Sequence, residues 1–175
     1  MDKLDWFIAE IVRIRRCVQV YIELFTGKEP IDILTNVSSE VFAIVQRSMH
    51  DEILISVARL YEGKKNLSQL NLVSPHENIL TDDLNKLREE TRTLLDKIDI
   101  KDYRIKVAHN INDTDKIIKH NIDSETLILL LDTSLRLIIG LKAELKQEQN
   151  VSIPVMINEK YEGKGKALIS MLSKI

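Results

Sequence analysis

Apolar residues recur at three- and four-residue spacing through most of the chain, which is the spacing of one face of an α-helix. The first such stretch runs from about residue 3 to residue 26 and is followed by Gly27 and Pro30, residues typical of positions just beyond a helix end. A second stretch follows Ser38 and Ser39, both good N-cap residues, and ends before Gly63. The pattern therefore predicts two long helices here.

The same periodicity predicts two more long helices later in the chain. Thr81 is suited to cap the third, whose first turn holds Asp82 and Asp83, acids favoured at the positive end of the helix dipole. Ser124 is the expected cap of the fourth, over residues 127–145, which is apolar around much of its circumference in its first half. Such a helix needs two neighbours, and a dimer interface is one way to supply the second.

Two segments have weaker patterns. Residues 63–80 mix turn-forming residues with scattered leucines and predict a partly packed loop with at most a short helical turn. The tail after Val151 contains Pro154, Gly163 and Gly165 and then a short amphipathic stretch. The chain is therefore predicted to be all-α: an antiparallel up-and-down four-helix bundle over residues 1–150, with residues 151–175 forming a tail whose short helix packs on the same domain.

Composition supports this class and limits the functions. Only five Gly and three Pro occur in 175 residues, which favours helices over turn-rich sheets. A lone Cys17 cannot form an internal disulfide, and Asp132 and Arg136 interrupt the most apolar stretch, so no membrane helix is expected. We interpret the protein as cytoplasmic. Its formal charge of −2 gives no general attraction for nucleic acid, so RNA contact would need a local basic patch.

Common metal and cofactor sites have no support in the sequence. A carboxylate-bridged di-metal bundle needs Glu three residues before His. The residues three before His50, His76, His109 and His120 are Arg47, Val73, Lys106 and Ile117. The chain has no His-Glu-x-x-His pair, no cysteine cluster, no P-loop and no dinucleotide glycine pattern. We therefore expect no metal and no cofactor.

One arrangement remains, Arg104 followed five positions later by His109. On a helix this step is about 7.5 Å of rise, and a long Arg side chain can still reach the imidazole's surroundings. RNA cleavage without a metal needs a group of near-neutral pKa to move a proton and a cation to stabilise charge on phosphorus; a His and an Arg have these properties. Residues 101–120 carry five basic and three acidic side chains, a modest local excess compatible with phosphate binding.

The stretch Tyr103-Arg104-Ile-Lys-Val-Ala-His109-Asn110, after the third long helix, resembles the HEPN superfamily, whose hallmark is Arg-x(4–6)-His. Residues 56–62, SVARLYE, and 67–70, LSQL, extend the resemblance to the abortive-infection AbiU-type branch, over about residues 1–150. The resemblance implies a metal-independent endoribonuclease, often a phage-defence toxin, whose two subunits pair so that both Arg/His sets line one cleft.

The residue roles follow by position. The resemblance makes Arg104 and His109 catalytic. Our candidates for substrate contact are Lys106, Asn110, Asn112 and Arg59. The implied partners are RNA, a second copy of the chain, and an antitoxin or nucleotidyltransferase.

Other interpretations stay open. The residue after the motif Arg is commonly polar in the family but is Ile105 here, which favours a catalytically inactive HEPN-like module that binds RNA or protein. Arg104 and His109 could instead be a helix-end ion pair and a partly buried His, and Arg59 could bond to an acid across the bundle. A third hypothesis is a structural bundle that associates through Leu130 and Leu131 of the fourth helix.

Overall fold

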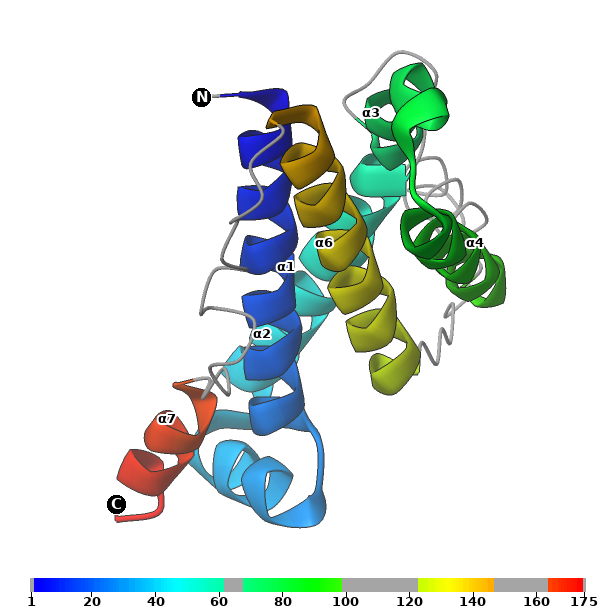
Figure 1. Ribbon diagram of the computed structural model, residues 1–175. Coiled ribbons are helices and arrows are strands. Elements are labelled where there is room, and N and C mark those ends of the chain that lie inside the picture. Colours follow the sequence, from blue (N-terminus) through cyan, green and yellow to red (C-terminus); the bar gives the residue numbers. More distant parts are fainter. Residues whose placement is uncertain (1, 62–67, 99–122, 147–163, 175) are drawn as a thin grey trace, which may run out of the picture.

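The computed structural model describes residues 2–61, 68–98, 123–146 and 164–174. These residues form helices and no strand, so the all-α prediction is confirmed. The elements are α1 (Lys3–Phe25), α2 (Lys28–Tyr61), α3 (Gln69–Val73), the 3-10 helix η1 (Ser74–Ile79), α4 (Asp82–Lys97), α6 (Ser124–Lys146) and α7 (Gly165–Leu172). In Figure 1, α1 descends, α2 returns upward, α4 descends again, and α6 rises between α1 and α4.

A tight turn joins α1 to α2. The backbone N–H of Thr26 donates to the Ile22 carbonyl at 3.0 Å, and Gly27 follows with a φ of +94°, a left-handed conformation that glycine adopts without strain. The next helix begins at once, at Lys28. Our expectation of a connection before Ser38 is therefore wrong. Pro30 did not prevent a helix because it lies in the first turn, where its missing N–H would have no partner.

Ser38 divides α2 into two helical segments, residues 28–37 and 39–61. Its φ of −169° and ψ of 98° are extended rather than helical. The predicted start at Ser38 or Ser39 is thus correct for the second segment. A change of direction at this serine lets the first segment cross below α1 while the second runs back along it (Figure 1).

The fourth predicted helix, α6, lies at the centre of the core. Its most enclosed apolar side chains are fully buried and face α1, α3 and α4. They are Leu130, Leu131, Leu137, Ile138 and Leu141. Leu130 and Leu131 are therefore covered by helices of the same chain, and the hypothesis that these two leucines form a dimer interface is wrong.

Asp123 caps α6, one residue before the predicted cap. Its carboxylate accepts hydrogen bonds from the backbone N–H groups of Glu125 at 3.1 Å and Thr126 at 3.3 Å, and from the Thr126 hydroxyl at 2.6 Å. These bonds, with the hydroxyl foremost, lower the pKa of the Asp123 carboxyl. Ser124 is instead the first helical residue.

The packing of α4 against α6 depends on two local features. The Thr81 hydroxyl accepts from the Leu84 N–H at 3.4 Å, so the predicted cap of α4 is confirmed. Leu84 then lies against Gly140 of α6 so closely that a Cβ at position 140 would collide with the Leu84 side chain. The absence of a side chain at Gly140 lets the two helices approach.

The segment before α4 contains more helix than we expected. α3 and η1 together cover residues 69–79, and Leu72 and Val73 are buried in the core. The expectation of a packed connection is confirmed. The expectation of at most one short helical turn underestimated the length of helix in this connection.

Helix α7 packs on α1 and α2. Glu23 is 7% exposed and accepts a hydrogen bond from the Lys166 N–H at 3.3 Å. A series of side-chain hydrogen bonds connects Glu23 to α6. Gln19 donates to Glu23 at 2.9 Å and accepts from Arg15. Arg15 in turn pairs with Asp132 of α6 at 3.2 Å. None of the described helices is long and apolar enough to cross a membrane.

The central position of α6 predicts different costs for two adjacent leucines. Leu130 is fully buried, whereas Leu129 is 48% exposed. Leu130→Ala should lower the free energy of unfolding by about 2–5 kcal/mol because it leaves a cavity, and Leu129→Ala by no more than about 0.5 kcal/mol. Urea unfolding followed by circular dichroism measures both; equal costs would contradict the central position of α6.

Candidate functional site

Most of the predicted site lies in one stretch of the chain. Arg104, Lys106, His109, Asn110 and Asn112 all fall between Ile98 and Asp123, outside the described residues. Their arrangement stays a prediction. The described residues do show the two ends of this stretch: Ile98, the C-cap of α4, is 6% exposed, and Asp123 caps α6.

Arg59 lies on α2 and is exposed to solvent. Its charge acts on Glu10 of α1. The pKa of the Glu10 carboxyl is lowered, first by its hydrogen bond from Arg13 and also by the charge of Arg59. Arg59 therefore contributes to the charge balance of the α1–α2 surface, and its predicted role in substrate contact stays a prediction.

Arg13 connects α1 to α2 at that surface. Its guanidinium donates to both carboxylate oxygens of Glu10 at 2.7 and 2.9 Å, to Glu52 at 3.0 Å and to the Ser56 hydroxyl at 2.8 Å. Ser56 is fully buried and donates in turn to Glu52 at 3.0 Å. The sequence analysis missed this group. Its signals were the three-residue spacing of Glu10 and Arg13, and a serine inside the apolar run of α2.

His50 also lies on the α1 side of α2. Its ring centroid is 6.1 Å from that of Tyr21, and its Nδ1 is 3.6 Å from a carboxylate oxygen of Asp51. These two contacts give His50 an aromatic neighbour and an acidic neighbour.

A buried polar cluster joins the end of α2 to α3 and α6. The Tyr61 hydroxyl is 2.6 Å from the Ser134 hydroxyl, which donates to the Gln69 side-chain oxygen at 3.4 Å. Since Ser134 has one proton and gives it to Gln69, Tyr61 donates to Ser134. Tyr61 belongs to the SVARLYE stretch and Gln69 to the LSQL stretch. Two separate parts of the family resemblance thus meet on one serine of α6.

A cavity of about 410 Å³ opens beside this cluster. It lies among the end of α2, α3, α4 and α6. Its lining residues are Tyr61, Gln69, Val73, Arg88, Glu89, Thr91, Arg92, Leu95, Asp96 and Leu137. Two arginines and two acids balance one another there, and Arg88 is also paired with Glu77 at 2.6 Å. The size suits a small ligand, but the charge of the lining favours neither anions nor cations.

The Tyr61 hydroxyl beside the cavity is suited to hydrogen bonding rather than to proton transfer. Burial raises the pKa of the Tyr61 phenol well above its usual value, so this group stays protonated near neutral pH. The residue as a whole is partly exposed, but its hydroxyl is enclosed. Within the described ranges, no three His, Cys, Asp or Glu side chains come together as a group that could hold a metal.

The comparisons with known proteins add no relative. No family model, curated protein or solved structure matches this chain. A functional assignment therefore depends on the residues of the chain and their placement.

The polar cluster generates a double-mutant prediction. Ser134→Ala leaves the enclosed Tyr61 hydroxyl without its partner and should cost about 1–3 kcal/mol of unfolding free energy, whereas Tyr61→Phe should cost about 0.5–1.5 kcal/mol. Once either group is gone the second substitution costs less, so the double variant should be more stable than the sum of the single costs implies. Urea unfolding of all four proteins tests this, and strictly additive costs would show that the two hydroxyls do not interact.

Proposed function

We propose that this chain is a metal-independent endoribonuclease of the HEPN type, with a HEPN-like bundle, that acts as a toxin in abortive-infection phage defence. It cleaves cytoplasmic RNA through Arg104 and His109, which two paired copies contribute to one cleft. The observation that carries the proposal is the Arg104-x4-His109 spacing after the third long helix of an all-helical chain. An antitoxin or a nucleotidyltransferase would be a further partner.

Two features of the fold support the proposal. The segment that holds the motif is fixed at both ends, by Ile98 in the core and by the Asp123 cap of α6. The 24 residues between Ile98 and Asp123 thus begin and end on two helices, α4 and α6, that pack against each other and give a catalytic segment a rigid base. In addition, the other two stretches that resemble the family meet at Ser134 through Tyr61 and Gln69.

The proposed reaction is an internal phosphoryl transfer. The RNA 2′-oxygen forms a bond to phosphorus as the bond from phosphorus to the 5′-oxygen breaks, which gives a 2′,3′-cyclic phosphate and a 5′-hydroxyl. His109 moves a proton from the 2′-hydroxyl or to the departing oxygen, and Arg104 stabilises the negative charge on the phosphorane. Lys106, Asn110 and Asn112 contact the substrate in this proposal, as does Arg59, which α2 presents to solvent.

Ile105 favours a second candidate function. An apolar residue after Arg104 departs from the family's common polar choice, and the net charge of −2 is low for RNA binding through general electrostatics. The second candidate is a catalytically inactive HEPN-like module that binds RNA or protein. It predicts a folded chain that binds a partner and leaves RNA intact at any concentration.

Cleavage of mixed cellular RNA in EDTA tests the proposal. The wild type should cut, and His109→Ala should cut at least about 100-fold more slowly because it lacks the proton-transfer group. His120→Ala is the matched control, since it removes another histidine from the same stretch but outside the motif. Circular dichroism confirms that all three proteins fold equally.

Three results would contradict the ribonuclease proposal. These are activity that EDTA abolishes, equal activity of His109→Ala and wild type, and RNA binding by the wild type without cleavage. The last result would instead establish the inactive binding module.

A further inference from the structure

The second segment of α2 has an apolar stripe that no described residue covers. Val41 is 54% exposed and Ile44 is 67% exposed, and Val37, just before the break at Ser38, is 45% exposed. Positions 41, 44 and 48 share one face of this second segment, where position 48 is an exposed serine. The partly buried Phe42, Val45 and Met49 lie on another face, and α2 packs against α1. This helix therefore has an apolar face left over after its packing within the chain.

Opposite charges stand along one edge of this stripe. Glu40 and Arg47 are seven residues apart, so they lie on the same edge about 10.5 Å from each other along the axis. The Arg47 side chain is 87% exposed, and its described contact is a long 4.0 Å pair with Asp51. Among the described residues, Glu40 has no ion-pair partner within 4.0 Å. A charged group of each sign is thus available beside the apolar residues.

We propose that a second copy of this chain covers the stripe, with the two α2 helices antiparallel about a two-fold axis near residue 43. In this register Val41 of each copy packs on Ile44 of the other. The same axis places Glu40 of each copy opposite Arg47 of the other, so one symmetric contact contains two ion pairs. The surface is self-complementary in both its apolar centre and its charged edge, as a two-fold interface requires.

The charge pattern selects this orientation. In a parallel pair of helices, a residue on this edge faces the position five residues further along the second helix. Glu40 would then lie beside Val45, and Arg47 beside Glu52, which Arg13 and Ser56 already engage in each copy. The antiparallel arrangement instead uses Glu40, which has no ion-pair partner within 4.0 Å among the described residues, and Arg47, whose pair with Asp51 is long at 4.0 Å.

This inference deepens the proposed function, which requires two paired copies, and identifies the surface that pairs them. Its test needs no RNA, because the quantity measured is the molecular mass of the protein in solution. The inactive variant His109→Ala should dimerise as the wild type does, so loss of cleavage and loss of pairing are distinguishable.

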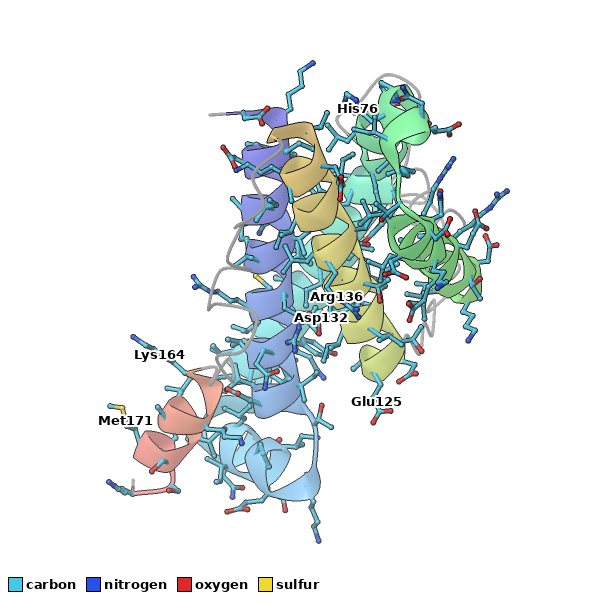
Figure 2. The ribbon with its side chains drawn as sticks, viewed as in Figure 1. His76, Glu125, Asp132, Arg136, Lys164 and Met171 are labelled. Carbon is cyan, nitrogen blue, oxygen red and sulfur yellow. The ribbon has the colours of Figure 1, made fainter. Side chains whose placement is uncertain are left out.

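The first test replaces the apolar centre. Sedimentation equilibrium should give the wild type twice the 20.2 kDa chain mass at micromolar concentrations. Ile44→Glu should raise the dimer dissociation constant roughly 100-fold or more, because each dimer loses two apolar contacts and buries two unpaired charges. Met171→Glu is the matched control: Met171 is also 67% exposed but projects from α7 (Figure 2), so this variant should dimerise normally. Both side chains are on the surface, so circular dichroism should show the same helix content for both variants as for the wild type.

The second test reverses the charged edge. Glu40→Arg and Arg47→Glu should each weaken the dimer roughly tenfold at low salt, because like charges then face each other twice. The double variant restores opposite charges and should restore the wild-type dissociation constant. A wild type that stays monomeric at its highest soluble concentration, an Ile44→Glu variant that dimerises normally, or a double variant as weak as the singles would overturn the proposal.

Discussion

The burial of α6 is the constraint on which the rest of the structure depends. Five of its large apolar side chains are completely removed from solvent, and α1, α3 and α4 supply the surfaces that cover them. Burying one such side chain stabilises a fold by about 1.5–3 kcal/mol, whereas an exposed ion pair contributes about 0–1 kcal/mol. Arg15 pairs with Asp132, which lies with Arg136 on one side of α6 (Figure 2), and this part-buried contact orients α1 against α6.

Polar contacts of α6 also connect it to other helices of the chain. Asp132 holds Arg15 of α1, and through Gln19 and Glu23 this contact extends to α7. Ser134 holds Tyr61 at the end of α2 and Gln69 in α3. Lys142 pairs with Asp5 near the start of α1. The helix that precedes the Arg104–His109 stretch and the helix that follows it are thus both parts of one core. A dimer formed through α2 leaves this core intact, because its proposed contact residues are already exposed.

The fold was predictable where local chemistry decides it. The three- and four-residue spacing of apolar positions located the long helices, and Thr81 identified the start of α4 correctly. Pro30 was misleading because the same residue can follow one helix or lie in the first turn of the next. Asp123 and Ser124 are adjacent and both are good caps, so the sequence could not choose between them. The exposed or buried state of Leu130 depends on three other helices and is not a local property.

The candidate site was less predictable for a physical reason. Tyr61 and Ser134 are 73 residues apart in the chain, and Gln69 and Ser134 are 65 apart. Their hydrogen bonds exist only because α2, α3 and α6 pack together, and no spacing of residues in the sequence predicts them. Arg13 and Ser56 meet across α1 and α2 in the same way. The Arg104–His109 pair, by contrast, is visible as a local motif, and its placement in the fold stays a prediction.

Native-state hydrogen exchange tests the central role of α6 most directly. The amides of residues 130–141 should exchange only when the whole chain unfolds, with an opening free energy equal to that from urea unfolding. The amides of α7, which packs on α1 and α2 and leaves Leu168 and Met171 exposed, should exchange through a smaller opening. Opening of residues 130–141 at a free energy as low as that of α7 would contradict the account.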